Sequence, residues 1–159
     1  MAKKKKKSSE DSSVAASNPK ARHSYTILES FEAGIMLTGS EVKSLRQGRA
    51  SLREAFAVIQ DGEVFLMSMH IPPYAQAGYA QHEPTRKRKL LLHKDQIQRL
   101  IGKTAEKGLT LVPLKCYFTR GLAKVELGLA RGKKLYDRRE DLKEKDAKRQ
   151  IERAMSRRR

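Results

Sequence analysis

The sequence is short of several kinds of residue, and each shortage excludes a class of protein. It has one cysteine, Cys116, and no tryptophan among its 159 residues. A single cysteine has no partner for an internal disulfide, which excludes a cystine-stapled scaffold. No apolar run approaches the roughly 20 residues of a membrane-spanning helix, and the lysine run at 3–7 precedes a Ser-rich stretch instead of the apolar core of a signal peptide. We therefore expect a cytoplasmic protein with no membrane partner.

Acidic residues are also scarce, with 18 against 35 lysines and arginines and a formal net charge of +17. An excess of this size is typical of proteins that bind a polyanion, most often a nucleic acid. The charge is +5 in residues 1–23, +5 in 24–130 and +7 in 131–159. We therefore divide the chain into a disordered basic arm (1–17), one folded domain (18–130) and a basic C-terminal tail (131–159). For the arm, we favour a solubilising role over specific recognition.

Residue patterns that carry catalysis or bind metals are missing as well. The four histidines are scattered, and none has the spacing of a metal site. Cys116 falls on the apolar side of a predicted strand, which favours a small buried side chain over a nucleophile. The acidic residues form no pair with the spacing of a general acid and base. The sequence therefore predicts no metal, no cofactor and no enzyme activity.

Hydrophobic periodicity predicts a mainly antiparallel β domain. We expect a strand from residue 25, a turn at 32–34, and a short helix at 41–46 with Ser40 as its N-cap. Strands at 51–60 and 63–70 are joined by Asp61-Gly62, a strong signal for a hairpin turn. A polar loop follows to about residue 88, and then a helix at 90–107.

The last two predicted strands are amphipathic. In the first, Val112, Leu114, Cys116 and Phe118 share one face, and the second alternates from 123 to 129 after a turn at 120–121. This order of elements fits a small closed barrel with flanking helices, but it also permits an open α+β sheet.

Two basic segments are candidates for contact with RNA. Residues 86–89 are four consecutive bases, and we favour RNA contact there over a solvated loop, with residues 18, 22 and 23 extending the same face. The tail is rich in helix formers but has no continuous apolar stripe. We expect it to fray in the free protein and to order against a polyanion; the alternative is a permanent exposed helix.

Four separated stretches resemble the motifs of the SmpB family, the bacterial SsrA (tmRNA)-binding proteins of trans-translation. They are NPKARH at 18–23, EAGIMLTGSEVKSLR at 32–46, HEPTRKRKLLL at 82–92 and GKKLYDRR at 132–139. The resemblance implies an OB-fold antiparallel barrel whose basic tail becomes helical in the ribosome. It also implies a non-enzymatic adaptor that binds the tRNA-like domain of tmRNA and helps deliver alanyl-tmRNA, with elongation factor Tu and GTP, to stalled 70S ribosomes.

The resemblance also implies two sets of site residues. We expect the protein to act as a monomer that binds tmRNA with one side of the barrel and reaches the small-subunit rRNA with its tail. Within the first set, Glu41 is expected to accept from a base edge or a ribose hydroxyl. Within the second, Tyr136 is suited to stacking on an rRNA base, and Gly132 to a sharp departure from the barrel. The tmRNA-binding set is Asn18, Arg22, Glu41, Lys43, Ser44, Arg46, Arg86, Arg88 and Lys89. The decoding-centre set is Gly132, Lys133, Lys134, Tyr136, Asp137, Arg138 and Arg139.

The chain departs from the family pattern in three places. Arg138 stands where the family usually has lysine, Gly78 and Gln81 stand in a loop that often carries asparagines, and the arm at 3–17 is not a family signature. The rival interpretations are a structural ribosomal protein, a general OB-fold RNA-binding protein and an RNA-processing enzyme.

Overall fold

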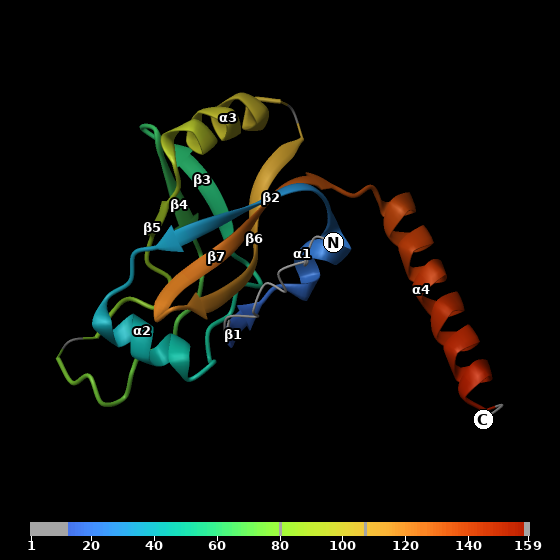
Figure 1. The fold of residues 1–159 in the computed structure, drawn as a ribbon, viewed down its shortest axis with the longest axis horizontal. Coiled ribbons are helices and arrows are strands. Elements are labelled where there is room, and N and C mark those ends of the chain that lie inside the picture. Colours follow the sequence, from blue (N-terminus) through green and yellow to red (C-terminus); the bar gives the residue numbers. More distant parts are fainter. Residues whose placement is uncertain (1–12, 80, 107, 158–159) are drawn as a thin grey trace, which may run out of the picture.

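A computed structural model describes residues 13–79, 81–106 and 108–157 of the chain. Strands dominate these residues, and the helices flank them (Figure 1). In chain order the elements are β1 (Ser13–Ser17), α1 (Pro19–Ser24), β2 (Tyr25–Ile35), α2 (Gly39–Arg46), β3 (Phe56–Gln60), β4 (Glu63–Met67), β5 (Arg88–Leu91), α3 (Lys94–Thr104), β6 (Leu109–Thr119), β7 (Leu122–Gly132) and α4 (Leu135–Ser156).

The strands close into a barrel. Their order is β6-β3-β4-β5-β2-β7, and β7 pairs back onto β6, so six strands form a ring of antiparallel pairs. β1 adds to the free edge of β6 outside this ring. The longest ladders join β7 to β2 and to β6. The predicted antiparallel barrel is therefore confirmed, and the alternative of an open sheet is wrong.

Two tight turns fix the hairpins of the barrel. Asp61 and Gly62 have φ of 51° and 74°, and Arg120 and Gly121 have φ of 51° and 75°. A type I′ turn needs positive φ at both central residues, and its twist matches that of the flanking strands. The hairpin turns predicted at 61–62 and 120–121 are confirmed.

A bulge in β6 divides its apolar side chains between two clusters. The register against β7 shifts between Pro113 and Lys115, and the extra residue reverses the alternation of the side chains. Cys116 and Phe118 consequently pack inside the barrel, whereas Val112 and Leu114 join Ala21 and Ala130 in a smaller cluster beside α1. The prediction that these four residues of β6 share one face is wrong.

Three other predicted elements differ from the structure. The expected turn at 32–34 lies inside β2, where a Cβ on Gly34 would come within 3.3 Å of Leu91 Cβ, so the glycine permits a close approach between strands. The start of the expected helix at 90–107 is instead β5, because Leu90 is buried between β2 and β4. The expected strand at 51–60 begins only at Phe56.

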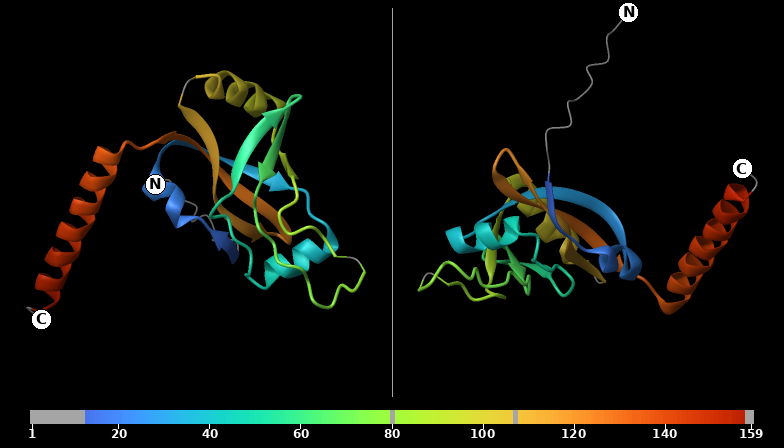
Figure 2. Two further views of the ribbon diagram at one scale, coloured as in Figure 1. Left: turned by 180° about the vertical axis from the view of Figure 1, so that it is seen from behind. Right: turned by 90° about the horizontal axis from the view of Figure 1, so that it is seen from below.

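The N-terminal end of the chain differs from expectation, and the C-terminal end adopts the exposed helix that was the alternative to a frayed tail. In place of a disordered arm up to residue 17, Ser13–Ser17 forms β1 and pairs with β6; residues 1–12 lie outside the described residues. The tail is the helix α4, which extends away from the barrel, with every residue from 142 to 157 exposed (Figures 1 and 2). No helix in the described ranges has both the length and the apolar character to cross a membrane.

Candidate nucleic-acid interface

The first candidate surface is built from α2 and the loop at 72–87, which leads from β4 to β5. Both lie at the same end of the barrel (Figures 1 and 2). Between them is a hollow of about 750 Å³. Its lining is polar or basic for the most part and consists of Thr38, Gly39, Ser40, Lys43, Tyr74, Gln76, Ala77, Gln81, His82 and Arg86.

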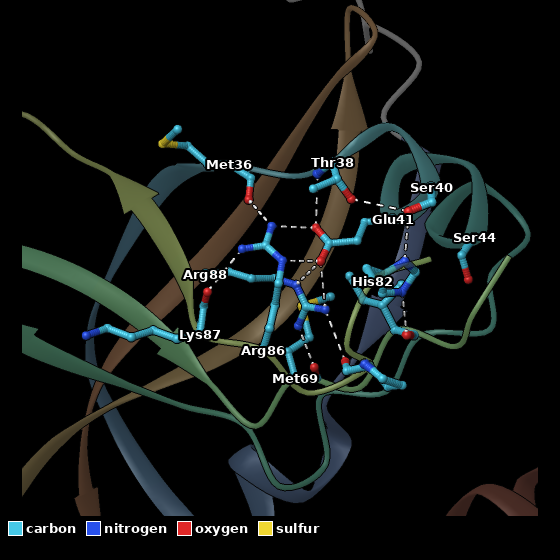
Figure 3. Close-up of polar contacts among 12 residues, drawn as sticks. Met36, Thr38, Ser40, Glu41, Ser44, Met69, His82, Arg86, Lys87 and Arg88 are labelled. Carbon is cyan, nitrogen blue, oxygen red and sulfur yellow. Dashed lines mark hydrogen bonds and ion pairs between the residues drawn. The ribbon is translucent and has the colours of Figure 1, made fainter. Parts of the chain in front are cut away.

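A buried carboxylate holds this surface together (Figure 3). The Glu41 side chain is wholly inaccessible to solvent, and Arg86 donates to it twice, with Nε 2.5 Å from Oε1 and Nη2 2.8 Å from Oε2. Arg88 Nε lies 3.2 Å from Glu41 Oε1. The Thr38 backbone N–H donates to Oε2 at 3.1 Å. One carboxylate on α2 therefore binds two arginines, Arg86 near the end of the loop and Arg88 at the start of β5.

The electrostatics keep all three groups ionised. Burial by itself would raise the pKa of Glu41, but the hydrogen bonds from Arg86 and Thr38 and the charges of both arginines outweigh it, so its pKa lies below the ordinary 4.5. The hydrogen bond to Glu41 raises the pKa of Arg86. Burial lowers the pKa of Arg88, against the opposing effect of Glu41. The cluster carries two positive charges and one negative charge, so it leaves one positive charge behind the surface.

Three of the residues predicted to contact tmRNA are internal supports in this structure. Arg88 is fully buried and also donates to Met69 O at 2.6 Å and to Pro84 O at 3.0 Å. Ser44 is buried, and its hydroxyl donates to Pro72 O at 2.7 Å. Glu41 accepts only from the protein, which does not fit the prediction that it accepts from a base edge or a ribose hydroxyl. These side chains hold the loop against α2.

His82 is a further support that the sequence interpretation did not single out. Its Nε2 is 2.9 Å from Ile71 O, an acceptor, so Nε2 carries the proton. Its Nδ1 is 2.9 Å from the Ser40 hydroxyl oxygen, so the ring joins α2 to the loop by a second hydrogen bond. Ser40 is available for this contact because the N-cap of α2 is Thr38, two residues before the predicted N-cap. The sequence signal was the position of His82 as the first residue of a family motif.

The exposed cations predicted from the motifs separate into two groups. Lys43 and Arg46 are exposed on α2, with Lys43 Nζ 5.6 Å from the centre of the Tyr74 ring and Arg46 Cζ 4.7 Å from that of Phe118. Arg86, with 30% of its side chain exposed, borders the hollow. Lys89 instead lies on β5 and donates to Glu63 at 2.8 Å. Lys43, Arg46 and Arg86 thus form the exposed basic part of the α2 surface.

Asn18 and Arg22 lie elsewhere on the molecule. α1 is beside the start of α4, away from the loop at 72–87 in each view (Figures 1 and 2). Asn18 is the N-cap of α1, and its buried side chain accepts from Ala21 N at 3.3 Å and donates to Pro113 O at 3.0 Å. Arg22 is exposed at the end of α1. These residues do not extend the α2 surface, and Asn18 has a structural role.

The predicted decoding-centre residues begin at the junction of β7 and α4. Gly132 ends β7 opposite Tyr25. Its φ is not positive, and a Cβ there would meet nothing within 4 Å. The chain can therefore turn from β7 toward α4 without a glycine at this position, contrary to the prediction. Lys133 N donates to Ser24 O at 3.0 Å, and its Nζ donates to Arg22 O at 3.2 Å and to Asp141. Lys134 is the N-cap of α4, and Arg139 is exposed.

The remaining members of this set are on the first turns of α4. Tyr136 and Asp137 belong to the helix, but the roles predicted for their side chains lie outside the described residues. Arg138 is partly buried and lines a hollow together with residues of the barrel. Lys133 therefore attaches the start of α4 to the folded domain, and Arg139 faces solvent.

Comparisons with known proteins agree with the motifs. A family model described as "SmpB protein" matches residues 15–157. The chain is 55% identical to the "SsrA-binding protein" of Syntrophobacter fumaroxidans over 100% of this chain and 99% of the relative. It is 63% identical to that of Acidothermus cellulolyticus over 91% of each chain. A solved structure described as "tmRNA-SmpB: a journey to the center of the bacterial ribosome" contains a chain with 58% identity and a TM-score of 0.64, covering 75% of this chain and 84% of that one.

Proposed function

The chain belongs to the SmpB protein family, and from that premise we propose that it is an RNA-binding adaptor of trans-translation. It binds the tRNA-like domain of tmRNA and helps to deliver alanyl-tmRNA, together with elongation factor Tu and GTP, to stalled 70S ribosomes. It acts in the cytoplasm as a monomer and catalyses no reaction. The barrel is of the OB type. The domain boundaries are those expected from the charge distribution, with two changes: β1 (Ser13–Ser17) joins the folded domain, and the tail starts after Gly132, where β7 ends.

The observation that carries this proposal is the basic surface of α2 and the loop at 72–87. Lys43, Arg46 and Arg86 are accessible there, and phosphates are the natural partners of such side chains. The buried Glu41 fixes Arg86 through two hydrogen bonds, so the guanidinium is oriented before RNA arrives. Lys89 is a weaker candidate for the same RNA, because it contacts Glu63 on another side.

We further propose that α4 enters the decoding centre and the empty mRNA channel. Its described residues from 142 onward are exposed and form no part of the barrel core. A helix that is polar all round is stabilised by the partner that surrounds it. A channel lined by rRNA phosphates suits the +7 charge of residues 131–159.

A competition gel shift tests the first part of the proposal. The labelled RNA is the tRNA-like domain, and the competitor is an unrelated structured RNA of equal length. We expect strong preference for the tRNA-like domain and a loss of affinity as salt increases, because each neutralised phosphate contributes about 0.7 to 0.9 to the slope of log affinity against log salt. The matched variants are Lys43→Gln on the surface and Lys94→Gln on α3, which remove the same charge. The proposal is contradicted if both RNAs compete equally, or if both variants lose the same amount of affinity for the tRNA-like domain.

A further inference from the structure

A second hollow is lined by residues of α1, β3, β6 and α4. Two of these elements, α1 and the start of α4, lie away from the loop at 72–87 (Figures 1 and 2). It has a volume of about 470 Å³. Its walls come from segments far apart in the sequence, with Lys20 from α1, Phe56 from the start of β3, Val112 from β6 and Arg138 from α4. The helix of the tail thus contributes one residue, Arg138, to the wall of this hollow.

Positive charge predominates around this hollow. Lys20, Arg53 and Arg138 line it with one acid, Glu54. Lys20 Nζ and Glu54 Oε1 are 3.3 Å apart, and more than half of each side chain is exposed, so water screens the pair and it exchanges easily. Two net positive charges therefore face the hollow, and an anion is the favoured occupant.

Arg138 adds a specific observation. Its Nε is a buried donor, and no acceptor for it exists among the residues that the structure describes. A buried N–H of a charged group without an acceptor is costly, and native proteins rarely leave one unpaired. A ligand in the hollow that draws the Arg138 side chain toward an acceptor oxygen would therefore supply the hydrogen bond that Nε lacks.

The other wall is aromatic and apolar. Phe56 is 42% exposed although it belongs to a strand of the barrel. The nearby floor contains Ala55 and Val112, which are buried, and Tyr25 borders the same hollow. A partly exposed ring beside a net positive charge suits a ligand that has both a flat apolar face and a negative group.

We propose that this hollow binds one nucleotide of single-stranded RNA. The phosphate accepts hydrogen bonds from Arg138 and from Lys20 or Arg53, and the base stacks on Phe56. This site rests on the proposed function to the extent that the protein meets RNA at the start of its tail. It differs from the α2 surface in position and in residues, and it gives Arg138 the role of a phosphate ligand.

The test uses the full-length protein and a short fluorescent oligoadenylate, followed by anisotropy at fixed salt. In Arg138→Lys the charge remains but the N–H at the position of Nε is lost, and we expect affinity to fall about tenfold. Arg139→Lys makes the same exchange on the exposed side of α4 and is expected to change affinity by less than about twofold, because the charge that displaces counterions is unchanged.

Phe56→Leu keeps an apolar side chain without a ring and is expected to weaken binding by about fivefold or more. Thermal unfolding identifies any variant that fails to fold.

Two further measurements decide between a nucleotide and a simple anion, and between RNA sources. An oligonucleotide with abasic sugars is expected to bind more weakly than oligoadenylate and to be insensitive to Phe56→Leu. Arg138→Lys is then titrated with the tRNA-like domain and with isolated small ribosomal subunits. A loss with the first assigns the nucleotide to tmRNA, and a loss with the second assigns it to rRNA.

The proposal is overturned if Arg138→Lys and Phe56→Leu bind oligoadenylate as the wild type does, or if removing the bases has no effect. Its failure is distinguishable from failure of the proposed function. If the wild type shows no preference for the tRNA-like domain, the adaptor role is wrong, while the oligoadenylate titrations still decide whether this hollow binds a nucleotide.

Discussion

Glu41 and Arg88 are 47 positions apart in the sequence, yet both side chains are completely buried, with Arg88 Nε 3.2 Å from Glu41 Oε1. The pair joins α2 to the start of β5. Its charges are removed from water, so each depends on the other and on Arg86. A carboxylate that was predicted to contact RNA is in this structure an internal support of the α2 surface.

Replacing Glu41 by Gln should destabilise the fold by about 3 to 5 kcal/mol, because it leaves two arginines buried or half-buried without a counter-charge. Urea unfolding measures the change. The control is Glu63→Gln, which removes a carboxylate that is 47% exposed in its pair with Lys89 and should cost less than about 1 kcal/mol. Equal effects in the two variants would show that the buried cluster contributes no more than a surface ion pair.

Glu41 should also make the stability depend on pH in acid. Its pKa is lower in the folded protein than the ordinary 4.5, so its contribution is complete above that value and is lost as the pH falls through the lower, folded-state pKa. The difference in free energy of unfolding between wild type and Glu41→Gln should therefore shrink below about pH 4.5. Urea titrations of both proteins from neutral to acid pH measure it, and a constant difference would contradict the assignment.

Lys133 should limit the motion of α4. Its Nζ contacts Arg22 O and Asp141, which connects the barrel to the second turn of the helix. In Lys133→Met, we expect a broader distribution of distances between spin labels placed by Ser30→Cys and Ser156→Cys. The control is Lys134→Met, which removes the same charge from an exposed side chain. Distributions of equal width in both variants would mean that the contact does not restrain the helix.

Removing the tail after Lys134 should separate two activities. The cut preserves all of β7, including the pairing of Gly132 with Tyr25, so the barrel keeps its closure and the α2 surface. We expect affinity for the tRNA-like domain to remain close to that of the full chain and peptide tagging on stalled ribosomes to disappear. A gel shift measures the affinity, and a reconstituted reaction measures the tagging. If the truncation removes both, the barrel and the tail do not have the separate functions proposed.

Cys116 should be inert in the folded protein. It is fully buried inside the barrel, and burial raises the pKa of its thiol to about 12. The thiolate is the reactive form, so a disulfide reagent at pH 8 should react only on global unfolding. Reaction followed in native buffer and in denaturant measures this, and rapid labelling in native buffer would contradict the burial.

Local signals in the sequence predicted part of this fold well. Asp61-Gly62 requires a particular turn, and the alternation from 123 to 129 fits one strand with one buried face, so both predictions succeeded without knowledge of distant contacts. The consecutive leucines at 90–92 fit either a helix or a buried strand. Residues 90 and 91 form a strand in the structure because they pair with the neighbouring strands β2 and β4. The bulge in β6 follows Pro113, and strands accept proline mainly at edges and bulges, so the sequence carried a signal that the prediction of one shared face did not use.

The motifs predicted part of the α2 surface, but Asn18, Arg22 and Lys89 lie elsewhere on the molecule, and the positions of the side chains were harder to predict than the residues. The motifs singled out Glu41, Ser44 and Arg88, whose importance is consistent with their burial. Sequence alone does not show that the loop folds back so that Arg86 reaches α2, 45 positions away. His82 went unassigned because its partners, Ser40 and Ile71, are also remote in the chain.

The short connection between β7 and α4 makes the tail a lever. Only Lys133 and Lys134 separate the last strand of the barrel from a helix of 22 residues, which is about 33 Å long. A rotation of about 10° at this joint would move the far end of α4 by about 6 Å, roughly one helical turn. A small tilt of the barrel on its RNA is therefore enough to change which groups the distal arginines can reach.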